Sequence, residues 1–324
     1  MGSNSEKLTQ QVNVLFHDLT SNEFQHSMDH RFNHEEERWK RATSLFLNFS
    51  RPVKLLDIGT GTGFVPLTIA DQLGSMDLFI CSDISGGILE VAKQNIAKRD
   101  FKCSFKYCKI DSQVPYVLPF EASSTDAVLM NEVLHHIDDT DTFLKEVDRV
   151  LKPGGLLFIG HEPNKYFYEN IFLRINHRVI HFLLHPGIYA RKFLRKTRLE
   201  KLFDHVYYHV YPLKGNAREK AMKYDKTITD EINRNLIQDG LIKQPLPREE
   251  ILMILDAKWV GRTEFKPDKL LPSYDLKFLE TTQHLGFLPY SDYEKPRISK
   301  YYEFLRKKYQ KSGYIFFAVY KKNG

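Results

Sequence analysis

The fold is decided by the stretch Val53-Lys54-Leu55-Leu56-Asp57-Ile58-Gly59-Thr60-Gly61-Thr62-Gly63. Its first half is a short apolar run, as expected of a strand that is buried on both faces of a parallel sheet. Glycines follow at alternate positions, and residues 64–73 are predicted to form a helix. Glycines let a ligand approach the backbone, and the free N–H groups at a helix start attract its polar groups. The stretch therefore predicts a nucleotide-type ligand site at the end of a strand.

The same pattern of a short apolar strand and a helix recurs over the next hundred residues. Further strands are expected at 78–83, 105–110, 127–130 and 156–160, and helices at 88–98 and 142–151. Strands that alternate with helices form βαβ units, and their sheet is covered on both faces. We therefore predict an α/β fold with a doubly wound, mostly parallel sheet.

The composition excludes several classes of protein. Hydrophobic residues make up 42% of the chain and charged residues 27%, which excludes general disorder. The net charge of +6 is too small for a dedicated nucleic-acid coat protein. Cys81, Cys103 and Cys108 form no C-x-x-C pair, so we expect neither a disulfide scaffold nor a zinc site, and a cytoplasmic location. The first ten residues lack a signal peptide pattern, and no run of 18 apolar residues is present.

The spacing of the glycines distinguishes a dinucleotide from other nucleotide-type ligands. A dinucleotide site needs G-x-G-x-x-G, but Phe64 stands where the third glycine would be. Asp57, two residues before the first glycine, adds little to a phosphate site and suits a ligand with a positively charged amino group. No G-x-x-x-x-G-K-[ST] element is present, which excludes a P-loop.

The stretch from Asp57 to Gly63 resembles motif I of the class I, Rossmann-like methyltransferases that depend on S-adenosylmethionine (SAM), in their small-molecule branch. The resemblance covers about residues 51–163 and continues in register through four further features. These are Asp83 at the end of the second strand, Asp111 at the end of the third, Asn131-Glu132-Val133-Leu134-His135-His136-Ile137 after the fourth, and the sequence LKEVDRVLKPGG from Leu144 to Gly155.

The resemblance implies a seven-stranded sheet whose last strand is antiparallel, and 313–320 is the candidate for that strand. It also implies SAM as cofactor and S-adenosylhomocysteine (SAH) as product. The glycine-rich loop would contact the cofactor, and further residues would contact its ribose, adenine and sulfonium. In chain order, the residues of these contacts are Asp57, Gly59, Thr60, Gly61, Gly63, Asp83, Ile84, Asp111, Ser112, Asn131 and Glu132. No metal is expected, because His26, His30 and His34 are more simply explained as the polar face of a helix.

Three histidines are candidates for a general base or for a group that positions the acceptor: His135, His136 and His161. Each is also compatible with a purely structural role, packed or solvated. The candidates to line the acceptor pocket come from the next segment and are Tyr166, Phe167, Tyr168, Phe172 and Tyr189.

The chain is expected to have four parts: a helical N-terminal segment (1–50), a SAM-binding core (51–164), a helical lid insertion (165–248) and a C-terminal completion of the sheet (249–324). The insertion is basic, with 17 Lys and Arg against 8 Asp and Glu, and its most basic stretch is 191–201. That stretch is a solvated lid face, a contact for an anionic partner or membrane surface, or an RNA contact; nucleic acid is the least expected.

The resulting hypothesis is an enzyme that transfers a methyl group to a small organic or lipid-like acceptor by in-line displacement under the lid. The alternatives are a tRNA-modifying methyltransferase and a non-catalytic SAM-fold partner subunit. The acceptor and the oligomeric state stay open.

Overall fold

We analysed a computed structural model of the chain. The structure describes residues 2–28, 33–47, 52–111, 116–137, 139–184, 216–255, 264–282, 300–301, 304–305 and 307–324. The basic stretch 191–201, Ser112 and Tyr189 lie outside the described residues. None of the described helices is long and apolar enough to cross a membrane.

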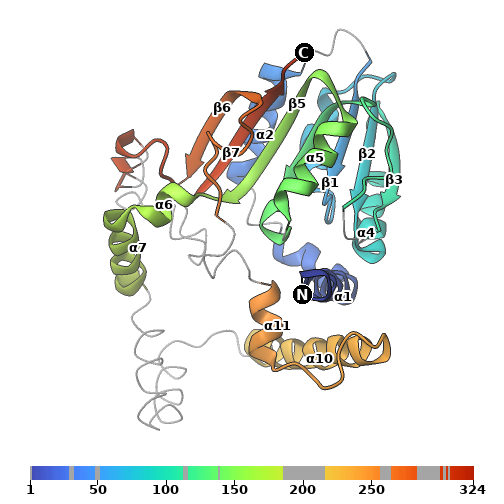
Figure 1. Ribbon diagram of the computed structural model, residues 1–324, viewed down its shortest axis with the longest axis vertical. Helices are drawn as coiled ribbons and strands as arrows, with labels where there is room; N and C mark the ends of the chain where they lie inside the picture. Colours follow the sequence, from blue (N-terminus) through green and yellow to red (C-terminus); the bar gives the residue numbers. More distant parts are fainter. Residues whose placement is uncertain are drawn as a thin grey trace.

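A seven-stranded sheet forms the centre of the molecule (Figure 1). Its strands are β1 (Lys54–Ile58), β2 (Leu78–Asp83), β3 (Ser104–Lys109), β4 (Thr125–Asn131), β5 (Leu151–Pro163), β6 (Tyr274–Thr282) and β7 (Ile315–Lys322). Their spatial order is β3-β2-β1-β4-β5-β7-β6. The first five strands are mutually parallel, and β7 is antiparallel to both β5 and β6. The predicted fold class and antiparallel last strand are confirmed, whereas β6 had not been predicted individually.

Helices cover both faces of this sheet because alternate residues of each strand point to opposite sides. On one face, Leu55 belongs to a cluster that includes residues of α2 (Asn33–Phe46), α3 (Phe64–Ile69) and α4 (Gly86–Ala97). On the other, Leu56 packs in a cluster with α5 (Thr140–Val150). Short 3-10 helices η1 (Ala70–Gln72) and η2 (Leu134–His136) complete this part.

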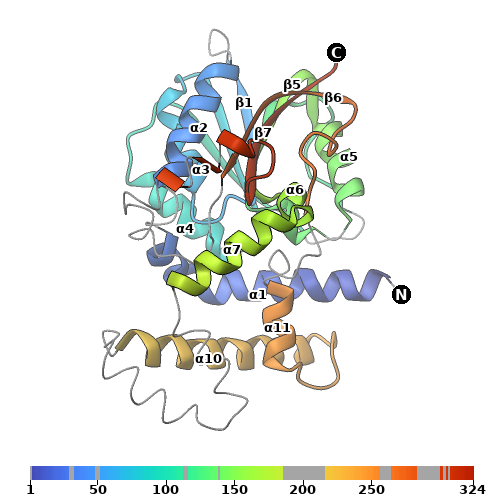
Figure 2. The same ribbon diagram turned by 90° about the vertical axis from the view of Figure 1, so that its left-hand side faces the viewer.

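A second group of helices lies beyond the carboxyl ends of the parallel strands. Helix α1 (Gly2–Met28) runs beside α10 (Asn216–Gln238) and α11 (Arg248–Leu255), as Figures 1 and 2 show. An apolar cluster joins the three helices through Val12, Ile228, Ile232, Leu236 and Ile251. On its other side α1 contacts α4, so this helix connects the sheet domain to the outer pair.

The chain leaves β5 through α6 (Lys165–Glu169) and α7 (Ile171–Leu184), which project to the side of β6 and β7. Phe167 is buried against Tyr314, with ring centroids 5.0 Å apart, and the Tyr166 hydroxyl donates to Asp268. These two aromatic residues are therefore held by the C-terminal part of the chain.

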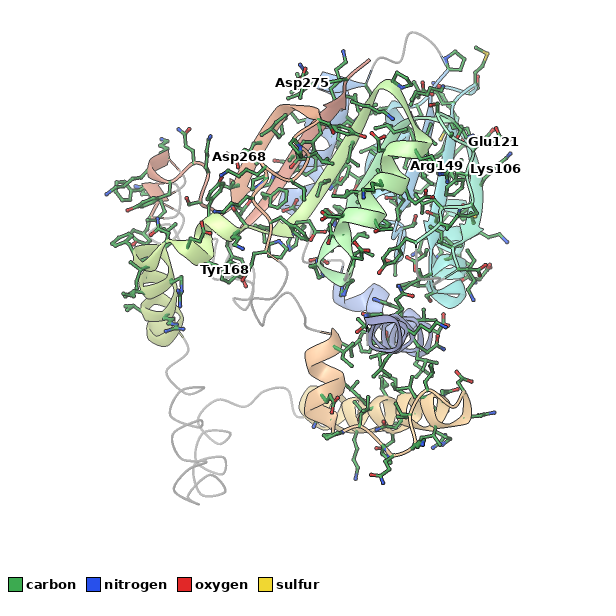
Figure 3. All side chains as sticks on the ribbon, viewed as in Figure 1. Lys106, Glu121, Arg149, Tyr168, Asp268 and Asp275 are labelled. Atoms are coloured by element: carbon green, nitrogen blue, oxygen red, sulfur yellow. The ribbon has the colours of Figure 1, made fainter. Side chains whose placement is uncertain are left out.

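Hydrogen bonds from side chains of α5 hold the loop before β4 in place. Arg149 extends from α5 and is labelled in Figure 3. Its guanidinium donates to the carbonyl oxygens of Leu118 and Phe120 and pairs with Glu146. The Glu146 carboxylate accepts the N–H of Leu118. This loop is thereby held against the cavity that is described next.

Candidate active site

A cavity lies between the ends of β1, β2, β3 and β4 and helix α1. Polar residues of the strand ends, apolar residues and three residues of α1 line it together: Gln10, Asn13, His17, Ile58, Gly59, Thr60, Gly61, Thr62, Phe64, Val65, Asp83, Ile84, Ile88, Ile110, Asp111, Tyr116, Val117, Leu118, Asn131, Glu132, Val133, His136, Ile137 and Phe143. In open parallel sheets, ligands bind at this edge, near the point where the strand order reverses.

The glycine-rich loop forms one wall of the cavity. Gly59, Gly61 and Gly63 have φ angles of 71°, 56° and 100°, a backbone region that favours glycine. A Cβ atom on Gly59 would lie 2.5 Å from the Val133 side chain, so the loop after β4 packs directly on this position. The Thr60 hydroxyl accepts the N–H of Ser82 and joins the loop to β2.

Asp83 lies at the centre of the polar wall. Its carboxylate accepts the N–H groups of Gly61 at 2.9 Å and Ser85 at 3.0 Å. Burial raises the pKa of Asp83, while the nearby His17 and these backbone donors oppose the rise. Ile84 lines the cavity beside it, and Asp111 reaches the cavity from the end of β3.

The lining suits SAM. A carboxylate that is fixed by two backbone N–H groups can accept both hydroxyl groups of a ribose. The loop has no side chain at Gly61, where an added Cβ atom would meet nothing within 4 Å, so a ligand can approach the backbone there. Apolar side chains such as Ile84 and Ile110 provide surfaces for a flat base.

Residues 56–159 match the family model described as a methyltransferase domain. The chain carries a class I SAM-dependent methyltransferase domain. SAM is its cofactor.

Several relatives of this methyltransferase domain are named ubiquinone/menaquinone biosynthesis C-methyltransferase UbiE. The protein of Cellvibrio japonicus is 26% identical over 185 residues, which cover 55% of this chain and 71% of the relative. That of Teredinibacter turnerae is 31% identical over 122 residues, covering 37% and 47%. The chain thus spans about half the length of the second relative. Among solved structures, a putative methyltransferase from Bacillus halodurans is 16% identical, covers 90% of this chain and 100% of its own, and has a TM-score of 0.41.

Two of the predicted cofactor residues of the methyltransferase domain lie behind the cavity wall. Asp57 is fully buried beneath the loop, and this burial raises its pKa well above the ordinary value. Gly63 precedes α3 and packs against Ala92 of α4. Their contact to the ligand would be indirect, because neither is among the lining residues.

The three histidines have different positions. His135 is buried, and its Nδ1 lies 2.9 Å from Glu162, whose carboxylate also accepts the N–H groups of Val133, Leu134 and His135. This carboxylate fixes the turn after β4, and the structure does not bring the His135 side chain to the cavity. His136 does line the cavity, with its ring centroid 3.9 Å from that of His135.

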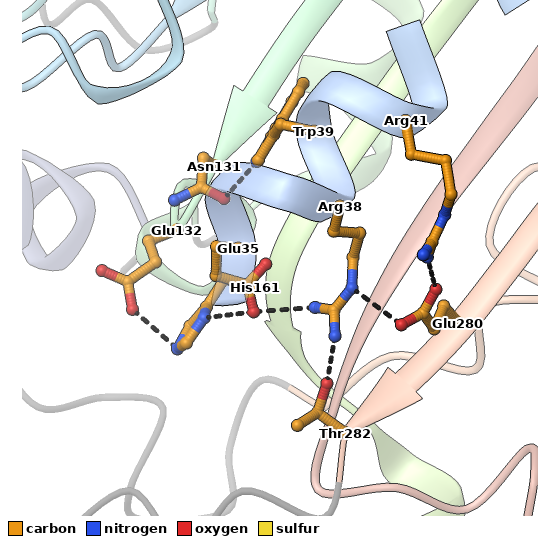
Figure 4. A network of polar contacts seen from close by, with 9 residues as sticks. All are labelled: Glu35, Arg38, Trp39, Arg41, Asn131, Glu132, His161, Glu280 and Thr282. Carbon is orange, nitrogen blue, oxygen red and sulfur yellow. Dashed lines mark hydrogen bonds and ion pairs between the residues drawn. The ribbon is translucent and has the colours of Figure 1, made fainter. Parts of the chain in front are cut away.

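His161 belongs to a polar network behind the cavity floor (Figure 4). Its Nε2 lies 3.1 Å from the Glu132 carboxylate, and its Nδ1 lies 3.4 Å from the Glu35 carboxylate. Arg38 pairs with Glu35 at 2.7 Å and also reaches Glu280 on β6 at 3.3 Å. His161 therefore connects a residue of the cavity with the second helix of the chain.

A hydrogen bond from α2 also fixes the Asn131 side chain. Trp39 of α2 donates its indole N–H to the Asn131 side-chain oxygen at 3.1 Å. Trp39 is itself fully buried between Phe158 and Phe317. The second helix thus supports the cavity floor through two separate contacts, one to Asn131 and one to His161.

Sequence reasoning missed the α1 residues of the cavity, Gln10, Asn13 and His17, and the loop residues Tyr116, Val117 and Leu118. The pattern of residues 1–50 indicated a helix but not which side chains would face a ligand. No local signal distinguishes these polar residues of α1 from ordinary surface residues.

Proposed function

We propose that the protein transfers a methyl group from SAM to a ring carbon of a lipid-like hydroquinone. The apolar part of the cavity carries this proposal. Its lining includes Tyr116, Val117, Leu118, Ile137 and Phe143. Such a wall suits an aromatic ring with an apolar substituent. The relatives named C-methyltransferases of quinone biosynthesis support a carbon acceptor, and an electron-rich hydroquinone ring is the form that can attack through carbon.

Bound SAM supplies an activated methyl group, so the chain itself has to align the acceptor and exclude water. Asp83 and the loop at Gly59–Gly61 hold the cofactor, with Ile84 and Asp111 at its adenosine end. Asn131 and Glu132 lie on the floor, where in-line displacement places the acceptor. Ser112 keeps its predicted role at the adenine edge.

The helical cover completes the site in this proposal. Helix α1 supplies three lining residues, and its Val12 packs with Ile232 of α10 and Ile251 of α11. Residues 165–248 then act as a lid together with α1, since α10 supports α1 from outside. The free thiols of Cys81, Cys103 and Cys108 agree with a cytoplasmic location.

The test has two stages. Calorimetric titration with SAH and with NADH identifies the cofactor, and we expect binding of SAH alone. The protein is then incubated with SAM and short-chain prenyl benzo- and naphthohydroquinones, kept reduced by dithionite, and the products are analysed by mass spectrometry. We expect one methyl group on a ring carbon, and Asp83→Ala as the control without product.

The same assay separates the alternatives. Methylation of a tRNA transcript that weakens steeply with salt, with every hydroquinone untouched, would identify a tRNA-modifying enzyme. SAH binding without methylation of any acceptor would favour a non-catalytic partner subunit.

A further inference from the structure

We propose that Glu132 accepts the proton that the acceptor releases, and that His161, fixed by Glu35, positions the Glu132 carboxylate for this role. The inference rests on the proposed function in one respect: methylation of a hydroquinone releases one proton. It assigns Glu132 a chemical role in addition to its place on the floor, and it makes His161 a positioning residue.

The backbone at both residues is the first observation. Glu132 and His161 have φ angles of 59° and 56°, and among the described residues other than glycine only Ser123 shares this conformation. Each such residue costs about 1–2 kcal/mol, and such strain persists where the surrounding structure enforces it, often at functional sites. These two strained residues contact each other, Nε2 to Oε1, at 3.1 Å. The Glu132 N–H also donates to the Gly160 carbonyl at the end of the neighbouring strand β5.

The second observation is the charge behind His161. Burial would raise the pKa of Glu35, but the Arg38 guanidinium and the hydrogen bond from His161 lower it to about 2. Glu35 is therefore a carboxylate at neutral pH, and it can accept a hydrogen bond from the Nδ1 of His161, which lies 3.4 Å away. This leaves Nε2 facing Glu132, so the position of the ring is determined from α2. A carboxylate that orients an imidazole in this way is a recurrent device in enzymes.

The exposed fraction of the carboxylate distinguishes the Glu132–His161 pair from the Glu162–His135 pair. His135 makes a similar contact to Glu162, but both side chains are completely buried. Glu132 in contrast is 21% exposed and lines the cavity. Of the two carboxylate–histidine pairs, only the one at Glu132 can exchange a proton with a molecule in the cavity.

The proton and charge balance of the reaction supports the assignment. Transfer of the methyl group would leave a neutral thioether in place of the sulfonium, so one positive charge would disappear from the cavity. The O–H bond of the hydroquinone breaks, its electron pair moves into the ring, and the ring carbon forms the new bond. The ring hydrogen at that carbon then returns to the oxygen. Glu132 takes the one proton that is released, which keeps the net charge of the cavity unchanged.

Other titratable groups surround Glu132. The cavity lining also contains His17 of α1, Asp83 of β2, Asp111 after β3, Tyr116, and His136 of η2. His161 of β5 contacts Glu132 directly, and Glu35 and Arg38 of α2 lie behind it. Asp83 is held by backbone N–H groups, and burial lowers the pKa of His17. Glu132 is the carboxylate on the floor whose proton uptake can be tested directly by comparing SAM with SAH.

The experiment needs no acceptor. Binding of SAM and of SAH is measured by calorimetry in buffers of different ionisation enthalpy, which reports the protons taken up on binding. Because SAH lacks the positive charge, we expect more proton uptake with SAH than with SAM. Glu132→Gln is expected to abolish this difference while changing the SAH affinity less than about threefold. Glu37 is an exposed carboxylate of α2, so Glu37→Gln is the matched control and should retain the difference in proton uptake between SAM and SAH.

Activity gives a second measurement. Glu132→Gln is expected to lower methyl transfer at least about a hundredfold, the usual range for a lost general base. Glu132→Asp should recover part of this loss. His161→Asn should shift the acidic limb of the pH–rate profile with an unchanged KM for SAM, which a purely structural role would not do.

The outcomes are distinguishable. Equal proton uptake with SAM and SAH in the wild type, or a difference that persists in Glu132→Gln, would overturn the assignment of Glu132. The expected difference in proton uptake without methylation of any hydroquinone would support Glu132 as the proton site and reject the proposed acceptor.

Discussion

The two walls of the cavity are built in different ways. The wall at Gly59, Asp83 and Asp111 consists of residues that directly follow strands, and its hydrogen bonds run between neighbouring strand ends. The second wall comes from α1, whose His17 is separated by more than 60 residues from Asp83, and from the loop at Tyr116. The first wall depends on local chain geometry, whereas the second depends on how a distant helix packs. We therefore expect substitutions in the first wall to have the larger effects.

The largest effect is expected from Asp83→Ala. The substitution removes a carboxylate that accepts two backbone N–H groups and, in the proposed complex, two ribose hydroxyls. Hydrogen bonds to a charged group contribute about 1.5–3 kcal/mol each, so the loss of two should lower the affinity for SAH roughly a hundredfold to ten-thousandfold. Calorimetry measures the affinity, and circular dichroism checks that the fold is retained. An SAH affinity close to that of the wild type would remove Asp83 from the site.

The first wall was also the part that the sequence predicted well. Asp83 and Asp111 follow apolar runs, and parallel strands bring their carboxyl ends to one edge, so proximity could be inferred from order alone. Strand β6 escaped detection because charged residues such as Asp275, Lys277 and Glu280 interrupt it, and because it pairs only with β7 at the edge of the sheet.

The histidines and α1 show why the rest could not be predicted. Which of His135 and His136 faces the cavity depends on Glu162, a residue of the next strand. The network at His161 depends on Glu35, which lies 126 positions earlier in the chain. Such contacts are set by tertiary packing, and neither spacing nor composition contains them.

Two glycines of the first wall provide a matched pair. Gly59→Ala combines the left-handed backbone penalty of about 1–2 kcal/mol with an overlap at Val133, for which overpacking costs about 1–3 kcal/mol. We expect a loss of about 2–5 kcal/mol in the free energy of unfolding. Gly61→Ala carries the same backbone penalty without a neighbour within 4 Å, so a loss of about 1–2 kcal/mol is expected.

Chemical denaturation measures both losses. The double variant Gly59→Ala/Val133→Ala should regain part of the stability that Gly59→Ala loses, because it removes the overlapping side chain. Equal losses for the two glycine variants, with no recovery in the double variant, would show that the loop is not packed against the chain after β4.

Substitution of Glu35 tests whether contacts of the N-terminal segment contribute to the free energy of unfolding. Its pKa is about 2 in the folded protein, against an ordinary value of 4.5. A depressed carboxyl pKa stabilises the fold above pH 4.5, and this contribution is lost as the pH falls from there through about 2. At about 1.4 kcal/mol for each pH unit, the contribution is roughly 3 kcal/mol at most. Urea unfolding between pH 2 and 5 should therefore show a flatter pH dependence for Glu35→Gln, whereas the exposed Glu37→Gln should follow the wild type.

The smallest effect is expected in the second wall, from His17→Ala. His17 is half-buried near Asp83, and its desolvation lowers its pKa, so it is mainly neutral at pH 7 and acts through contact. Loss of one neutral contact costs about 1 kcal/mol, which corresponds to a roughly fivefold weaker affinity for SAH. The affinity ratio of variant to wild type should stay nearly constant between pH 7 and 8, and the exposed Lys7→Ala on the same helix should bind like the wild type. An effect of His17→Ala as large as that of Asp83→Ala would contradict the distinction between the two walls, because a helix placed by packing would then contribute as much to cofactor binding as the strand ends.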